Sequence, residues 1–208
     1  AELSGGNPKI HFYLGSIYER LQRYKDAIYN YRQAGANLMV QRDGSVAQVG
    51  TPLELYHAPR NMFVAGFIGS PKMNFMSGEL LEGPADRARV RLRQGEMIEA
   101  KVDASALKPG QPVTVGVRPE HAELGTSTQH VIRELHWQER LGESTYLYLD
   151  SGVANEPLVV KAPGHAHADA GQRIALALPA HALHLFDEQG HALPRRVPAA
   201  DLRVPHAA

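Results

Sequence analysis

The segment GHAHAD contains two imidazoles and a carboxylate close together, on His165, His167 and Asp169. Alternate side chains of an extended segment point the same way, so these three groups could approach one transition-metal ion. A polar loop between strands explains the same residues without a ligand. Because no fourth ligand stands out, and no residue to hydrogen-bond and orient the imidazoles, we expect no metal site here.

Two apolar runs end in acidic residues, as the magnesium-binding strand of a nucleotide-hydrolysing enzyme does. TYLYLD ends at Asp150, and ALHLFDE ends at Asp187 and Glu188. Such chemistry also needs a glycine-rich loop, G-x-x-x-x-G-K-[S/T], whose lysine reaches the β and γ phosphates. The sequence contains no Gly-Lys dipeptide. We therefore interpret both runs as β-strands that end in solvated turns.

The tetrapeptide LSGG precedes a predicted helix near the start of the sequence. The hydroxyl of Ser4 and the backbone N–H groups of Gly5 and Gly6 would lie at the positive end of that helix, where phosphate groups bind. Taken alone, the same stretch is a flexible leader before a capping residue, Asn7, and a first-turn proline, Pro8.

The segment GVRPEH gathers charged residues at the end of a predicted strand. Gly116 allows another chain segment to approach closely, and Pro119 ends the strand. We expect Arg118, Glu120 and His121 to form a charged cluster at the mouth of the strand. A local salt bridge at a barrel rim is the favoured interpretation, and contact with another domain or subunit is the alternative.

Composition limits the classes of partner. The 208 residues are 43% hydrophobic and 21% charged, with 22 basic and 22 acidic residues and no cysteine. The balanced charge gives no summed field for nucleic acid, so none is expected as a partner. The absence of cysteine excludes disulfides and thiolate zinc sites. No run approaches the roughly 18 apolar residues of a membrane span, and we expect a cytoplasmic protein.

Residues 8–34 predict two amphipathic helices separated by a polar turn. Their spacing resembles one tetratricopeptide repeat, with His11 where tryptophan is usual. The matching positions are Leu14, Gly15, Tyr18, Ala27, Tyr31 and Ala34. A generic amphipathic hairpin is the alternative. A single unit buries its apolar face poorly, so we expect Leu14, Tyr18 and Tyr31 to contact the following domain or another chain.

The rest of the chain predicts short strands and turns. An Asp43-Gly44 turn indicates a hairpin, and Thr51 and Asn61 each begin a short helix. Eight β-like runs follow: MNFMSGELL, ARVRLR, PVTVGVR, VIRELHW, STYLYLD, PLVVKA, RIALALP and ALHLFD. Their spacing is typical of a small barrel or sandwich. We therefore predict a mainly β fold with an N-terminal α-hairpin.

These segments resemble the carboxy-terminal part of the ATP-binding subunits of carbohydrate ABC importers. The resemblance runs from VAQVGTPLELYHAPRNMFVAGFIGSPKMNFMSGEL through GVRPEH to HLFD. It implies a regulatory domain of small oligonucleotide-binding-like (OB-like) β-barrels after the last part of a nucleotide-binding domain. The predicted divisions are residues 1–36 for leader and hairpin, 37–70 for the nucleotide-binding remnant, 71–194 for the OB-like regulatory barrel and 195–208 for a tail.

The leading hypothesis is a non-catalytic regulatory and dimerisation fragment of such a subunit. The resemblance implies a homodimer, importer permease and nucleotide-binding subunits as partners, possible docking of a regulatory protein, and a location at the inner face of the plasma membrane. ATP and magnesium belong to the intact family, and no cofactor is expected for this chain. Two alternatives remain open: an ATP-hydrolysing subunit completed by other sequence, and an interaction scaffold that uses the helical hairpin.

The resemblance also gives LSGG a meaning. In the importer family this tetrapeptide is a signature loop that contacts the γ-phosphate of ATP bound to the opposite subunit, and Ser4, Gly5 and Gly6 match it. Asn7 stands where glutamine is usual, and Pro8 replaces the basic residue that follows. We interpret the stretch as a vestigial signature loop, because a loop that senses a phosphate needs another loop to hold it.

Overall fold

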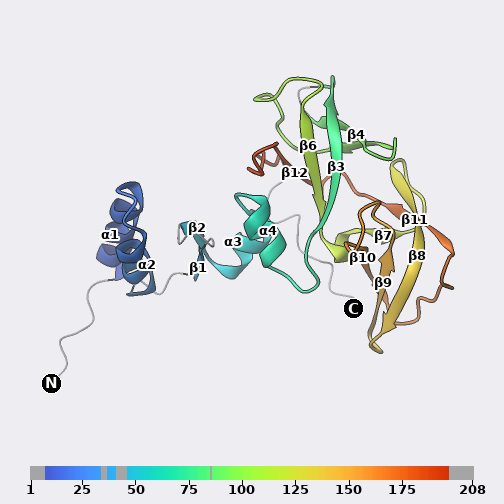
Figure 1. Ribbon diagram of the computed structural model, residues 1–208, viewed down its shortest axis with the longest axis horizontal. Helices are drawn as coiled ribbons and strands as arrows, with labels where there is room; N and C mark the ends of the chain where they lie inside the picture. The colour runs from blue at the N-terminus through green and yellow to red at the C-terminus, as the bar shows by residue number, and fades with distance from the viewer. Residues whose placement is uncertain (1–7, 34–36, 41–45, 85, 197–208) are drawn as a thin grey trace. The chain divides into compact units, whose positions relative to one another are not determined.

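The computed structural model describes residues 8–33, 37–40, 46–84 and 86–196 (Figure 1). The chain divides into two compact units, residues 1–68 and residues 69–208. Among the described residues, strands outnumber helices and the α-helices lie in the first unit, which confirms the predicted mainly β fold with an N-terminal α-hairpin. Within the described residues, no helix is long and apolar enough to cross a membrane.

The first unit opens with two paired helices, α1 (Pro8–Arg20) and α2 (Tyr24–Gln33). The turn between them contains Gln22, whose φ of 57° lets the chain reverse direction. The His11 ring nitrogen Nδ1 lies 2.9 Å from Oδ1 of the buried Asn30, so a polar contact joins the two helices where the repeat family has tryptophan.

Two short strands and two short helices complete the first unit. The strand β1 (Asn37–Val40) pairs antiparallel with β2 (Val46–Gly50), and the predicted Asp43-Gly44 turn lies outside the described residues. The helices α3 (Pro52–His57) and α4 (Met62–Phe67) begin where the sequence predicts. Thr51 closes a capping box with Glu54, and Asn61 accepts a hydrogen bond from the Val64 N–H.

A buried glutamine organises this part of the first unit. Gln48 on β2 donates from Nε2 to the Ala58 carbonyl at 3.0 Å and accepts from the Arg60 N–H at 2.8 Å. The segment between α3 and α4 is therefore held to β2 by one side chain. Ala47, Leu55 and Val64 form the small apolar core beside it.

The described residues of the second unit form ten strands. Their bounds are β3 Asn74–Leu81, β4 Ala88–Leu92, β5 Met97–Ala100, β6 Pro112–Val117, β7 Glu123–Leu124, β8 His130–Arg140, β9 Ser144–Leu149, β10 Leu158–Pro163, β11 Arg173–Ala177 and β12 His184–Phe186. The eight predicted β runs all form strands. β5 and the two-residue β7 were not predicted.

These strands form two five-stranded antiparallel sheets, in the orders β12-β6-β3-β4-β5 and β10-β9-β8-β11-β7 (Figure 1). The last strand, β12, returns to the first sheet, where His184 pairs with Gly116 of β6. The first sheet therefore contains a strand that follows all strands of the second sheet in the sequence.

One hydrophobic core serves both sheets. It joins Val90 and Val115 from the first sheet with Leu135 and Leu147 from the second, and all four are fully or almost fully buried. On β4 the burial alternates strictly, so one face of the strand lies in the core and the other faces water. Because both sheets bury their apolar faces in a common cluster, each depends on the other for its core.

A single buried side chain bridges the two sheets. Asn74, at the start of β3, donates from Nδ2 to the Val159 carbonyl on β10 at 2.8 Å and accepts from the Val159 N–H at 2.7 Å. The two residues are 85 positions apart in the sequence. The amide of Asn74 thus imitates a backbone partner, and it satisfies both polar groups of Val159 inside the protein.

We predict that Asn74→Ala destabilises the second unit by about 2 to 4 kcal/mol, because it leaves a buried N–H and a buried carbonyl without partners. Urea unfolding followed by circular dichroism measures the change. Lys72→Ala, at an exposed position two residues earlier, is the control and should stay within about 0.5 kcal/mol of the parent. Equal stability of Asn74→Ala and the parent would show that the bridge is dispensable.

Candidate functional site

The GVRPEH segment begins with the last two residues of the first-sheet strand β6 and continues beyond it. Gly116 lies under two side chains, since a Cβ atom there would be 2.6 Å from Met73 Sδ and 2.9 Å from Phe186 Cε2. The atoms that approach Gly116 closely are side chains of the same unit, and no backbone segment is among its nearest neighbours. A short 3-10 helix, η1 (Pro119–His121), ends the strand as expected.

The sequence predicted that Arg118, Glu120 and His121 would lie together at a barrel rim, but their exposure differs. Arg118 is only 1% exposed and is among the largest fully buried side chains, whereas Glu120 and His121 are half-buried. A buried guanidinium is normally held by hydrogen bonds and opposite charge, so Arg118 is placed to support the fold at this corner. An interface role for Arg118, Glu120 and His121 stays a prediction.

The histidine loop is held by ordinary polar contacts. His167 Nε2 lies 3.6 Å from Asp169 Oδ1, and His167 Nδ1 lies 3.0 Å from Gln138 Nε2. His165 is exposed on the same loop. Within the described part of the chain, no group of three histidine, aspartate or glutamate side chains is arranged to hold a metal ion.

The two acid-terminated strands end in turns, as expected. After β9, Asp150 Oδ1 accepts a hydrogen bond from the Gly152 N–H at 2.9 Å. After β12, Asp187 Oδ1 accepts from the His191 N–H at 2.7 Å. Each carboxylate closes its own turn, which is the structural role that the sequence favours over magnesium binding.

The predicted hairpin residues divide between core and surface. Tyr31 is 3% exposed and donates its hydroxyl to Glu19 Oε2 at 2.7 Å, and burial together with this acidic acceptor raises the pKa of Tyr31. Leu14 and Tyr18 are half-buried, and the Arg23 guanidinium lies 4.8 Å from the Tyr18 ring centroid. Tyr31 therefore packs inside the hairpin and is not available to a partner.

Much of the apolar face of α1 faces solvent within the first unit. Ile17 on α1 is 51% exposed, and Leu21, directly after the helix, is 61% exposed. Ile10 and Tyr13 are exposed on the same helix, at helical spacing with Ile17. Ser4, Gly5 and Gly6 lie outside the described residues, and their role stays a prediction.

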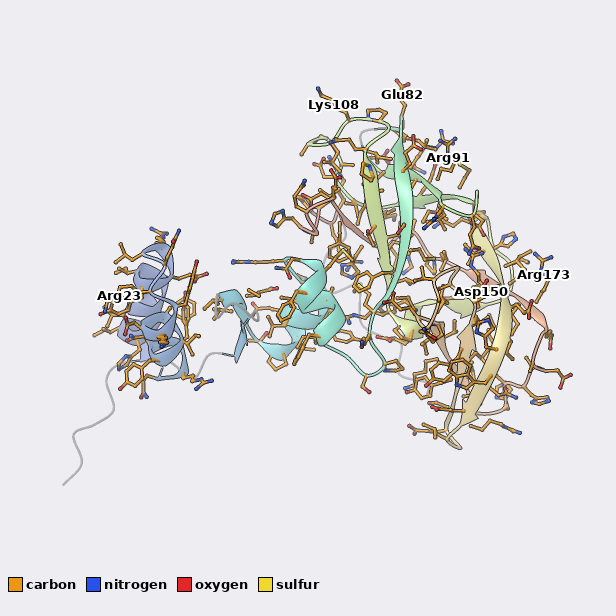
Figure 2. All side chains as sticks on the ribbon, in the orientation of Figure 1. Arg23, Glu82, Arg91, Lys108, Asp150 and Arg173 are labelled. Carbon is orange, nitrogen blue, oxygen red and sulfur yellow. The ribbon has the colours of Figure 1, made fainter. Side chains whose placement is uncertain are left out.

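Four alternating arginines on and around β4 were not among the predicted site residues, although the run RARVRLR shows them plainly. They are Arg87, Arg89, Arg91 and Arg93. All four are exposed on the outer face of the first sheet, and Figure 2 labels Arg91 at that surface. Strict alternation of arginine with apolar residues is the signal that could have identified this basic face.

Comparisons with known proteins define the class of the second unit. Residues 69–122 match the family model of the MalK OB fold domain, and residues 115–186 match that of the TOBE domain. Residues 69–186 of the second unit therefore contain an OB domain and a TOBE domain. The two matches overlap at residues 115–122, which include the end of β6. The last strand, β12, falls in the TOBE match although it pairs in the first sheet.

The relatives are sugar-importer subunits. The chain is 41% identical over 159 residues to the maltose/maltodextrin import ATP-binding protein MalK of Vibrio vulnificus, covering 76% of this chain and 43% of that protein. It is 35% identical over 190 residues to the MalK of Photorhabdus laumondii, covering 88% of this chain and 51% of that protein. Over its OB and TOBE domains, the chain is a homologue of these ATP-binding subunits.

The chain spans about half the length of these relatives or less. Among solved structures, the cytoplasmic molybdate-binding protein ModG aligns with a TM-score of 0.45 at 16% identity, covering 54% of this chain and 94% of that one. Neither matching family model includes residues 8–34, so the tetratricopeptide-like repeat stays a prediction.

The hairpin provides a test of that repeat. Alanine is normally about 1 kcal/mol better than glycine inside a helix. At Gly15, however, a Cβ atom would lie 2.7 to 2.9 Å from three atoms of the Tyr31 ring. We predict that Gly15→Ala destabilises the hairpin by about 1 to 3 kcal/mol, measured by amide exchange in residues 8–33. Ser16→Ala is the neighbouring control, and a stabilising Gly15→Ala would contradict close helix packing.

Proposed function

We propose that this chain acts as the non-catalytic regulatory and dimerising part of the ATP-binding subunit of a carbohydrate ABC importer. The observation that carries the proposal is the match of an OB domain and a TOBE domain to successive parts of one folded unit. The homologues that share this region are maltose/maltodextrin import ATP-binding proteins. Residues 37–70 are assigned to the end of the nucleotide-binding domain.

The sequence of the chain supports a role without catalysis. No Gly-Lys dipeptide is present, so the chain has no phosphate loop of the usual form. The carboxylates of Asp150 and Asp187 accept hydrogen bonds within their own turns. ATP and magnesium would then be held by sequence other than that of this chain.

The proposed partners follow from the family. A second copy, the importer permease and nucleotide-binding subunits, and a regulatory protein would meet the chain at the cytoplasmic face of the membrane. The corner formed by Glu120 and His121 is the proposed contact, because both side chains are partly exposed while Arg118 is buried beside them.

A second candidate function is protein recruitment through the helical hairpin. It is favoured by one observation, the row of exposed apolar side chains on α1, which includes Ile10, Tyr13 and Ile17. Exposed apolar rows on a helix are typical docking surfaces for another helix.

One experiment separates these functions. We predict that the purified chain sediments as a dimer, that deletion of residues 1–36 leaves the dimer intact, and that neither form binds ATP with micromolar affinity. Sedimentation velocity and ATP titration, with and without magnesium, measure these properties.

Loss of the dimer on deletion of residues 1–36 would instead assign association to the hairpin. Micromolar ATP affinity or magnesium-dependent phosphate release would contradict the non-catalytic role. A charge reversal at the proposed contact, Glu120→Lys, should weaken the dimer, with Glu188→Lys at an exposed turn as its control.

A further inference from the structure

The outer face of the second sheet carries three aromatic side chains in one patch. Trp137 on β8 lies opposite Tyr148 on β9. Their rings stack, with centroids 4.7 Å apart and ring planes 10° apart. Tyr146 lies two residues before Tyr148 on the same strand, so its side chain points to the same face of the sheet. We call these three side chains the aromatic patch.

A β-bulge turns Trp137 to the outer face. Leu135 pairs with Leu149, but Trp137 pairs with the adjacent Tyr148, so His136 is an extra residue on β8. Strict alternation would point Trp137 to the same side as Leu135, which is 1% exposed. His136 and Trp137 are instead both exposed. Bulges redirect side chains in this way, and they are frequent next to functional sites.

The aromatic patch leaves much ring surface in water. Trp137, the only tryptophan of the sequence, is 46% exposed although Tyr148 stacks on it. Tyr146 and Tyr148 are half-buried. A large aromatic ring contributes more apolar surface than any other side chain, and burying it is a main source of binding energy at interfaces. The exposed surface of these rings is therefore available to a ligand.

Hydrogen-bonding groups lie beside the rings. Glu139 on β8 and Lys161 on β10 both pair with Tyr146, one from each side. Their strands lie about 10 Å apart, because neighbouring strands are about 4.8 Å apart. The Tyr148 hydroxyl donates to Glu139 Oε2 at 2.9 Å. Among the described residues, neither the second oxygen of Glu139 nor the Lys161 ammonium forms a hydrogen bond or ion pair.

The charges around the aromatic patch favour a small and neutral ligand. Glu134 and Glu139 are exposed on either side of Trp137 along β8, and Glu134 lies opposite the exposed Arg173. With Lys161, the border thus carries two acidic and two basic groups, which leave no net charge. A stable protein interface buries about 800 Å² on each partner and keeps charge away from its centre. Three rings bordered by charges match a smaller ligand.

A neutral ligand that suits this surface needs an apolar face and a polar edge. A pyranose sugar has both, since C–H groups cover the face of its ring and hydroxyl groups surround it. The C–H groups gain dispersion energy against an aromatic ring. Each hydroxyl can donate to a carboxylate or accept from an ammonium group.

We propose that the aromatic patch binds a neutral saccharide. Trp137 and Tyr146 contact the C–H faces of the sugar rings. The free carboxylate oxygen of Glu139 accepts from one hydroxyl, and Lys161 donates to another. The class of ligand follows from the surface alone, whereas the choice of an α-linked glucose oligomer as first probe rests on the proposed function in carbohydrate import.

The fluorescence of Trp137 tests the site, because no other tryptophan contributes to the signal. We expect maltotriose to change the emission of the full chain saturably, with a Kd of about 1 mM or tighter. Tyr146→Ala should weaken binding at least about fivefold, and Lys161→Ala at least about threefold. Cellotriose, with β-linkages, is the second probe, and sorbitol, an acyclic polyol, is the solute control.

Ile132→Ala is the matched protein control. Ile132 is 43% exposed on the outer face of the same strand, about 15 Å from Trp137 along β8. This substitution should change the Kd by less than about twofold. Lys161→Ala alters an exposed side chain, so it decides the outcome even if Tyr146→Ala does not fold.

Saturable binding of either oligosaccharide, weakened by Tyr146→Ala or Lys161→Ala, supports the site. Absence of a saturable response to both overturns it, and so does an equal response to sorbitol, unchanged binding in Lys161→Ala or an equal loss in Ile132→Ala. A preference for cellotriose would keep the site and contradict only the choice of probe. The dimer and ATP measurements do not involve this patch, so failure of the proposed function is seen separately.

Discussion

The two hydrogen bonds between the Asn74 side chain and the Val159 backbone join sheets that share no strand pairing in this region. Without these bonds, the side-chain amide of Asn74 and the N–H and carbonyl groups of Val159 would be buried without hydrogen-bond partners. The common core makes this bridge necessary, because the sheets must lie against each other to bury Val115 and Leu147. Inside the apolar setting of the second unit, this contact satisfies the polar groups where β3 meets β10.

The path of the chain adds a second constraint. Because β12 pairs with β6 after the whole second sheet has been built, the OB domain includes a strand from the far end of the unit. Gly116 matches this arrangement, since it leaves room for Phe186 of β12 and for Met73. The β4–β5 turn also contacts the second sheet, since a Cβ atom at Gly152 in the loop after β9 would be 2.4 Å from Gln94 Nε2.

Local signals in the sequence predicted local structure well. The caps at Thr51 and Asn61, the eight strands and the turns at Asp150 and Asp187 each depend on a few neighbouring residues, and the structure has them where expected. β5 was missed because it is only four residues long and begins with the exposed, apolar Met97, which leaves too short a run of alternating residue types to indicate a strand.

Long-range features were not predictable in this way. Arg118 is part of a charged triplet in the sequence, and nothing in the triplet indicates that its guanidinium is buried. The Asn74 bridge joins residues 85 positions apart. Such features depend on which distant residues the packing of the sheets brings together, and the residue pattern of a single sequence does not predict those contacts. The resemblance to importer subunits supplied the domain class where periodicity indicated only a barrel or sandwich.

The most direct test of this account concerns the shared core. Native-state hydrogen exchange at increasing denaturant concentration reports the free energy at which each strand opens. We predict that the amides of β3 and β6 and those of β8 and β9 exchange through one common opening, with the same free energy and the same dependence on denaturant. Opening of β8 and β9 at a clearly lower free energy than β3 and β6 would show two separate domains and contradict a single core.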